Sequence, residues 1–214
     1  LFVGHHPNAI MKSDDFGKTW RRSDGTEIQT PASADDIEFL TKGGVDREVG
    51  LRAGCMAVDP KTGLPHLVYS VTENGKGRVI LATSDGKGDW TRVDLSLQLP
   101  SKLRDKDLIM AGGLSFNSAG ELHGAAQIQK AKEGELTWGN PSNESVRFVR
   151  DARRGSFKFS FASEPDPERS QWLPNIERAT GFNKVPDRPG IIYTSGSPGG
   201  KNTELLSNRV YWAG

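Results

Sequence analysis

Cysteine is almost absent from this sequence, with Cys55 the only one in 214 residues. A single cysteine excludes a disulfide within the chain, so cysteine content says nothing about the redox compartment. No apolar run approaches the ~20 residues that a membrane-spanning helix needs. A charge excess is also missing, since 28 Lys and Arg stand against 27 Asp and Glu. This balance argues against nucleic acid or an acidic membrane surface as the main partner.

Glycine and proline, by contrast, are plentiful, at 25 and 12 residues. Such a content is typical of many short strands joined by turns, and the length suffices for one large all-β domain or two small ones. The opening residues, Leu1-Phe2-Val3-Gly4, have the character of a strand end, and their apolar run is too short for a signal peptide. We therefore expect the chain to be a fragment or a processed form.

A tight turn between two strands is predicted at residues 13–20, which read Ser-x-Asp-x-Gly-x-Thr-Trp. Asp15 supplies a short acceptor side chain, and Gly17 supplies a permissive backbone. Thr19 and Trp20 then restart a strand, because β-branched and aromatic residues favour extended structure. Ser13 completes the pattern, which predicts a folding device more directly than a chemical one.

A second turn keeps the same spacing over residues 83–90. Thr83, Asp85 and Trp90 stand where Ser13, Asp15 and Trp20 stand in the first turn. The second turn departs from the pattern at two positions, where Lys87 replaces the glycine and Asp89 replaces the threonine. We treat it as a degenerate copy of the first turn.

An internal repeat relates residues 53–66 to residues 111–123, and each copy ends in a histidine, His66 or His123. Each copy opens a unit of four predicted strands. Four-strand units that recur every ~40–60 residues are typical of propeller blades, whereas a β-sandwich with the same strand count need not repeat itself. We predict an all-β chain forming a β-propeller of about four blades, two of them partial, at residues 1–22, 51–97, 110–162 and 171–214.

The Ser13–Trp20 turn, the stretch LRAGCMAVDPKTGLPHLVYS from Leu51 and the terminal QWLPNIERATG…NRVYWAG together resemble the Asp-box, or BNR-repeat, propellers of the sialidase superfamily. That group includes sialidases, ulvan lyases and enzymes that cleave between rhamnose and glucuronate. The resemblance implies a parent propeller of six or seven blades, with the Asp-box turns on the face away from the active site. It also implies a secreted or periplasmic protein that acts on a polysaccharide or oligosaccharide and needs no cofactor.

The lyase members of this group imply β-elimination beside a uronic acid. A base removes the proton next to the carboxylate, a cation neutralises that carboxylate, and an acid assists the leaving oxygen. By residue type and predicted side of the blades, the base is His5 or His6, and the carboxylate clamp is Arg52, just ahead of an inner strand. Tyr69 and Tyr193, on second strands, are candidate catalytic phenols. Exposed loop histidines, a surface arginine and packed strand tyrosines are the alternatives.

Three further residues are candidates for ligand binding or modification. Trp138 lies in a predicted ligand-side loop and could stack on a sugar ring. Arg178 is a candidate substrate contact near an inner strand, with a structural ion pair to Glu177 as the favoured alternative. Asn143 begins an Asn-Glu-Ser sequon, which has meaning only in a eukaryotic secretory setting.

Three functions remain open at this stage. We expect an enzyme, and we favour a uronate lyase over a sialidase-like glycoside hydrolase. The reason is that sialidases place a Phe/Tyr-Arg-Ile-Pro motif before their first box, and this motif is not present in the sequence. A non-catalytic propeller that binds a glycan or a protein is the third possibility, since a fold alone does not choose a function. Because the recurring His66 and His123 match each other, we assign both a structural role. No metal site is predicted.

Overall fold

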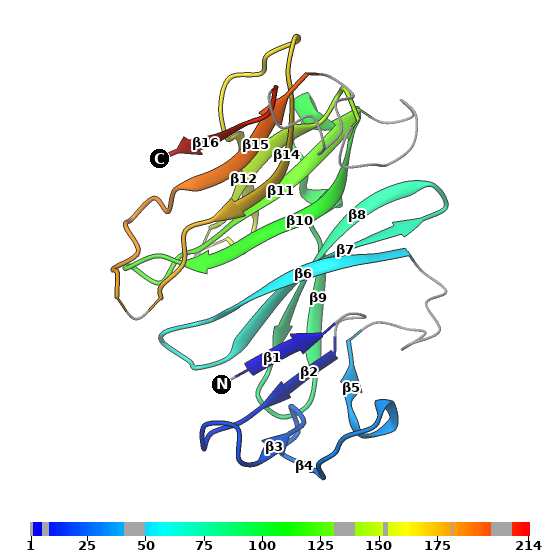
Figure 1. Cartoon of the computed structure of the whole chain (residues 1–214), viewed down its shortest axis with the longest axis vertical. Helices are drawn as coiled ribbons and strands as arrows, with labels where there is room; N and C mark the ends of the chain where they lie inside the picture. The colour runs from blue at the N-terminus through cyan, green and yellow to red at the C-terminus, as the bar shows by residue number, and fades with distance from the viewer. Residues whose placement is uncertain are drawn as a thin grey trace.

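A computed structural model describes residues 2–5, 9–40, 50–130, 140–151, 154–180, 182–197 and 207–214 of the chain. These residues form four antiparallel sheets, which we number in chain order. Each sheet is built from strands that are consecutive in the sequence and adjacent in space (Figure 1). The all-β prediction is confirmed.

The first sheet contains the shortest strands. It runs in the order β1, β2, β3, β4, with β5 pairing a second time with β2. The bounds are β1 Phe2–His5, β2 Ala9–Lys12, β3 Trp20–Arg21, β4 Glu27–Ile28 and β5 Glu38–Phe39, with a 3-10 turn at Ala34–Asp36. The region after Arg22 therefore folds back and returns β5 to its own sheet.

The second and third sheets are complete four-strand meanders. The second consists of β6 Gly50–Val58, β7 Pro65–Glu73, β8 Lys76–Ser84 and β9 Trp90–Asp94. Two 3-10 turns, Leu95–Gln98 and Ser101–Leu103, lead to the third sheet. That sheet consists of β10 Lys106–Phe116, β11 Leu122–Lys130, β12 Glu144–Arg150 and β13 Phe157–Phe161.

The fourth sheet has three strands in the described part of the chain. They are β14 Ser170–Ile176, β15 Ile191–Gly196 and β16 Arg209–Ala213. A long connection, residues 177–190, joins β14 to β15 and is called the loop wall below. Figure 1 shows the first sheet at the bottom of the view and the fourth sheet at the top.

Each sheet packs its apolar face on the next. Ile10 and Leu40 of the first region meet Leu67, Tyr69 and Trp90 of the second sheet. A larger cluster joins the second and third sheets, and a small one joins the third and fourth through residues such as Ala125 and Ile176. Since burial of apolar area is the main driving force for such stacking, the alternation of strands such as Phe157–Phe161 fixes which face turns inward.

A polar contact also ties the first sheet to the second. The indole Nε1 of Trp90 donates to Oε1 of Glu38 at 3.0 Å. The other carboxylate oxygen of Glu38 accepts from the backbone N–H of Ser23 at 3.0 Å and from its hydroxyl. The box tryptophan of the second sheet is therefore a packing residue whose polar edge is satisfied by the neighbouring sheet.

The first strands of the last three sheets lie side by side, with β10 between β6 and β14 (Figure 1). Gly113 makes this approach possible: a Cβ on it would stand 2.5 Å from Oδ1 of Asn175 and 2.8 Å from the backbone nitrogen of Ile176. Register shifts interrupt β6 between Arg52 and Cys55, and others interrupt β10. The sheets therefore converge along these strands.

The Ser13–Trp20 turn has the geometry that its sequence predicts. The backbone N–H of Thr19 donates to Oδ1 of Asp15 at 2.9 Å, and the Thr19 hydroxyl donates to Oδ2 at 2.8 Å. Ser13 donates to Asp15 and accepts from the N–H of Gly17, whose φ of 88° is the left-handed value that glycine tolerates. Asp15 is thus the centre of the turn.

Two other turns, each between a third and a fourth strand, are built on an aspartate. Asp85 Oδ1 accepts from the N–H of Lys87 at 2.7 Å and from that of Asp89 at 3.0 Å. In this second turn the hydroxyl of Ser84 accepts from the backbone N–H of Gly86 at 3.0 Å. Ser84, and not Thr83, therefore corresponds to Ser13, one residue later than predicted. In the third sheet Asp151 Oδ1 accepts from Arg154 N–H at 3.0 Å, an equivalent that the sequence pattern did not reveal.

The Ser13–Trp20 turn joins β2 to β3 of the first sheet. The Asp85 and Asp151 turns each join the third and fourth strands of their sheets, and we call this end of the second and third sheets the Asp-turn end. The turns between first and second strands, residues 59–64 and 117–121, lie at the same end, because a meander alternates direction at every strand. In Figure 1 this end is on the left. None of the helical segments in the described ranges has the length and apolar character needed to cross a membrane.

Candidate functional site

A cleft of about 720 Å³ opens at the Asp-turn end. Three segments line it: the end of β6, the end of β10 with its turn, and the loop wall. The lining residues are Met56, Ala57, Val58, Pro60, Leu114, Ser115, Phe116, Asn117, Ser118, Arg178, Ala179, Thr180, Asn183, Lys184 and Val185. The resemblance placed ligand-binding loops at the opposite end, so the position of this cleft differs from that expectation.

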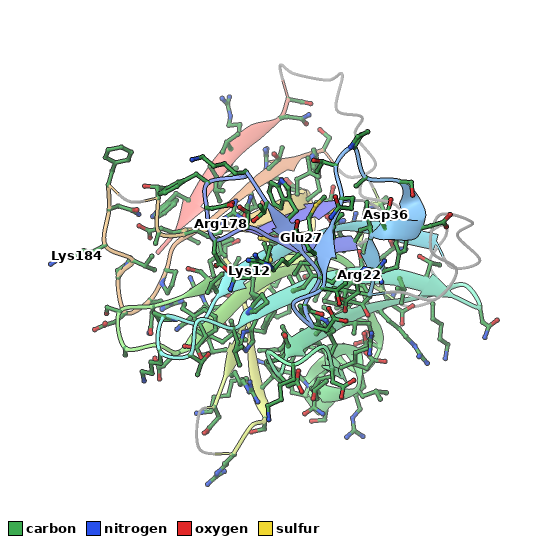
Figure 2. The ribbon with its side chains drawn as sticks, turned by 90° about the horizontal axis from the view of Figure 1, so that it is seen from below. Lys12, Arg22, Glu27, Asp36, Arg178 and Lys184 are labelled. Atoms are coloured by element: carbon green, nitrogen blue, oxygen red, sulfur yellow. The ribbon has the colours of Figure 1, made fainter. Side chains whose placement is uncertain are left out.

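The charge of the cleft is of one sign. Among the residues that the structure describes, its lining holds two cations, Arg178 and Lys184, and no Asp or Glu. Arg178 Nη1 donates to Sγ of Cys55 at 3.1 Å, which carries the guanidinium from the fourth sheet to the second. In Figure 2 Lys184 points outward from the loop wall, whereas Arg178 lies over the sheets. An anion approaching the cleft would therefore meet two exposed cations, Arg178 and Lys184.

The rest of the lining is apolar or neutral. Met56, Leu114 and Phe116 form an apolar side, and Thr180 and Asn183 add neutral polar groups. Asn183 is part of the loop's own structure, since its Oδ1 accepts from the N–H and the hydroxyl of Thr180 at 2.9 Å each. A mostly apolar cleft with a few placed polar groups is the usual form of a small-molecule site.

The third sheet holds the far half of the loop wall. Asn117 Nδ2 donates to the carbonyl of Asp187 at 2.8 Å, and the Ser118 hydroxyl donates to Asp187 Oδ1 at 2.6 Å. Arg147 Nη1 donates to the carbonyl of Pro189 at 2.5 Å. These three hydrogen bonds, called the latch below, fix the base of the wall whose near half, residues 178–185, faces the cleft.

Arg147 is a buried cation. Only 4% of its surface is exposed, and burial lowers its pKa to about 10, with a smaller effect from the charge of Arg188. The guanidinium remains charged at neutral pH because even the lowered value lies far above 7. A charged donor strengthens the bond to Pro189 relative to a neutral one.

Each of the two recurring histidines contacts a residue that lines the cleft. His66 packs its ring edge-to-face on Phe116, with centroids 5.1 Å apart, and its Nδ1 lies 3.3 Å from the Leu64 carbonyl. His123 Nε2 lies 3.3 Å from Asn117 Nδ2. Burial lowers the pKa of both rings. Both are buried and bonded to turn residues, as a structural role predicts.

Two of the residues predicted as base and carboxylate clamp lie on strands. His5 is the last residue of β1, opposite Ala9, and so lies at the other end of β2 from the Ser13–Trp20 turn. His6 lies outside the described residues. Arg52 is the third residue of β6, opposite Ser70, and not ahead of the strand as predicted. The backbone of Arg52 is therefore near the end of β6 opposite the one that lines the cleft.

Both candidate tyrosines are on second strands, as predicted, but they are packed. Tyr69 is 3% exposed among Ile10, Leu67 and Trp90, and burial raises its pKa. Tyr193 is 5% exposed and stacks on Tyr211 at 5.6 Å. Neither lines the cleft. Trp138 lies outside the described residues.

Of the predicted ligand contacts whose side chains the structure describes, Arg178 lines the cleft. The predicted ion pair with Glu177 is replaced by other bonds. Glu177 Oε2 accepts from the Gly190 N–H at 3.1 Å, which closes the base of the loop wall, while Arg178 turns to Cys55. The sequon asparagine, Asn143, is 1% exposed, so the folded protein does not present it for glycosylation.

Sequence reasoning missed Lys184, Asn117 and Asn183. The matching turns at residues 59–64 and 117–121 were a usable signal for Asn117, because both begin with an Asx residue after an inner strand. The loop wall gave no such signal, since its position depends on the latch. Among the described residues no group of three or more His, Cys, Asp or Glu side chains is arranged to hold a metal ion.

Comparison with known proteins adds a distant likeness. No family model matches the chain, and no curated protein matches it. Among solved structures, the crystal structure of a protein of unknown function from Dyadobacter fermentans DSM 18053 is similar to it, at 14% identity and a TM-score of 0.48. The match covers 98% of this chain and 54% of that one, so this chain spans about half the length of that protein.

Proposed function

We propose that the four sheets are blades of a β-propeller of the Asp-box kind, within a carbohydrate-active protein. The consecutive meanders, the side-by-side first strands β6, β10 and β14, and the matching positions of the Asp85 and Asp151 turns support this architecture. A β-sandwich would instead divide its strands between two facing sheets.

The function proposed for the Asp-turn cleft is binding of an acidic saccharide, with Arg178 as the carboxylate contact. The observation that carries this is the charge of the described lining residues, which include two cations and no carboxylate around an apolar side. A guanidinium can hold a carboxylate through two parallel hydrogen bonds. The apolar side, with Met56 and Phe116, suits the C–H face of a sugar ring.

The test compares two forms of one ligand. An oligogalacturonate and the same oligosaccharide with its carboxyl groups reduced to alcohols differ only in charge. Calorimetric titration should show binding of the acidic form and binding at least about tenfold weaker for the reduced form, since hydrogen bonds to charged groups are worth about 1.5–3 kcal/mol. Equal affinities would contradict the proposal.

Uronate β-elimination is the second candidate, and one observation favours it. His5 lies at the end of its sheet opposite the Asp-box turn, which is where the resemblance puts the chemistry. Incubation with uronate polysaccharides should then produce the ultraviolet absorbance of an unsaturated uronate. His5→Ala and His6→Ala are the variants to compare, and full activity in both would remove the histidine base.

A further inference from the structure

His123 stands beside the latch but is not part of it. Its Nε2 faces the Nδ2 group of Asn117 at 3.3 Å, and that group donates to the Asp187 carbonyl and to Oε2 of Glu121, each at 2.8 Å. Both amide hydrogens are thus directed at Asp187 and Glu121, and a proton on Nε2 would oppose an amide nitrogen that only donates. This geometry favours a His123 ring whose Nε2 is unprotonated.

The orientation of the Asn117 amide is fixed from its other side. Asn117 Oδ1 accepts from the Glu121 backbone N–H at 2.8 Å. If the amide turned over to offer its oxygen to a protonated His123, that oxygen would face the Asp187 carbonyl, and two acceptors would oppose each other. Turning the amide over in response to protonation would thus remove the donor from the Asp187 carbonyl.

The charges around His123 come from three elements. Arg147 on β12 and Arg188 in the loop wall disfavour a charged ring, whereas Glu121, whose Oε2 is 3.8 Å from Nε2, favours it. Burial is the largest effect, and the net result is a pKa below the ordinary 6.5. A protonated ring would draw Glu121 Oε2 away from Asn117, which weakens the same contact again.

We propose that His123 is a proton sensor for the cleft, acting through Asn117 on the hydrogen bonds that hold the loop wall. The idea rests on the proposed acidic-ligand site, because the regulated quantity is the position of the wall that carries Arg178 and Lys184. Above the pKa of His123 the latch is closed. As the pH falls through that pKa, Asp187 is released and the wall loosens.

The first test needs no ligand. The chain has four histidines, so the ring signals can be assigned by NMR with single variants. In a pH titration the amide signals of residues 187–190 should change with the same midpoint as the His123 ring, below pH 6.5. In His123→Gln, which stays neutral, these amide signals should no longer follow that midpoint.

His66→Gln is the matched control, because His66 holds the equivalent position and contacts Phe116 and Leu64 rather than the latch. It should leave the titration of residues 187–190 intact. A His123 ring that titrates while those amides do not move would overturn the proposal. So would an amide titration that persists unchanged in His123→Gln.

The second test measures oligogalacturonate affinity in the wild type and in His123→Gln at pH 7.5 and at a pH below the His123 midpoint found by NMR. We expect the wild type to lose affinity about threefold or more relative to the variant on acidification. No binding by either protein at either pH would refute the acidic-ligand site while leaving the NMR result to judge the sensor. Parallel pH profiles for both proteins would refute the sensor alone.

Discussion

Arg178 Nη1 donates to Sγ of Cys55 at 3.1 Å, which joins the residues just after β14 to β6 although β10 runs between these strands. The guanidinium is thereby held over the cleft by a soft, weak acceptor. A carboxylate is a much stronger acceptor for the same group. We expect an incoming acid to replace the thiol as the partner of Arg178.

Loss of this cation should weaken the acidic ligand. For Arg178→Gln we expect oligogalacturonate to bind roughly five- to tenfold more weakly, a smaller loss than for a buried charged hydrogen bond because the side chain is exposed. Arg178→Lys keeps the charge without the planar fork and should fall between the two. Calorimetric titration measures all three proteins.

Lys158→Gln is the charge-matched control for this experiment. Lys158 lies on β13, with 81% of its side chain exposed, and is not among the residues that line the cleft. Its loss should leave affinity unchanged. If both variants weaken binding equally, the attraction is a general effect of net charge rather than of the cleft.

The first aspartate turn should show in the acid stability of the protein. Hydrogen bonds from the Thr19 backbone, the Thr19 hydroxyl and the Ser13 hydroxyl lower the pKa of Asp15 to about 2 from 3.8. Because the folded value is the lower one, Asp15 stabilises the fold above about pH 4, and this contribution is lost as the pH falls toward 2. Asp15→Asn should lower the Tm at pH 7 and flatten its dependence on pH in that window.

Asp14→Asn provides the neighbouring control. Asp14 is exposed and forms a surface ion pair with Lys12 at 2.9 Å, a kind of contact that contributes little. Thermal unfolding followed by circular dichroism should place its Tm near that of the wild type. Equal effects of the two substitutions would show that the Asp15 turn has no special part in stability.

The convergence of β10 and β14 gives a third prediction. Gly113→Ala would place a Cβ against backbone and side-chain atoms of residues 175 and 176, and overpacking of this kind costs about 1–3 kcal/mol. Urea unfolding should show the loss. Gly155→Asn, in an open turn with φ of 69°, should cost far less, because asparagine tolerates that conformation.

Local pattern made the strands and the Asp15 turn predictable from sequence. The turn was recognisable because Asp15, Gly17 and Thr19 each act within a few residues of one another. The match of residues 53–66 to 111–123 predicted two equivalent sheets for a similar reason, since a repeated meander repeats its turns. The same reasoning found no third aspartate turn, because Asp151 lacks the tryptophan that marks the other two.

The cleft was beyond such reasoning. Its wall is held by Asn117, Ser118 and Arg147, which lie between 42 and 70 residues from their partners in the chain. The local sequence around these three residues does not indicate those partners. Arg178 was chosen from its place near an inner strand, yet its contact with Cys55 spans 123 residues, and the tyrosines chosen by type are core residues.

The most direct test of the acidic-ligand cleft is NMR shift mapping with an oligogalacturonate on the isotope-labelled protein. The account predicts saturable shifts at Arg178, Asn183, Lys184 and the turn that begins at Asn117, and none of these with the carboxyl-reduced oligosaccharide. Shifts confined to the hairpin after His5 and the start of β6, at the opposite end of the sheets, would contradict it.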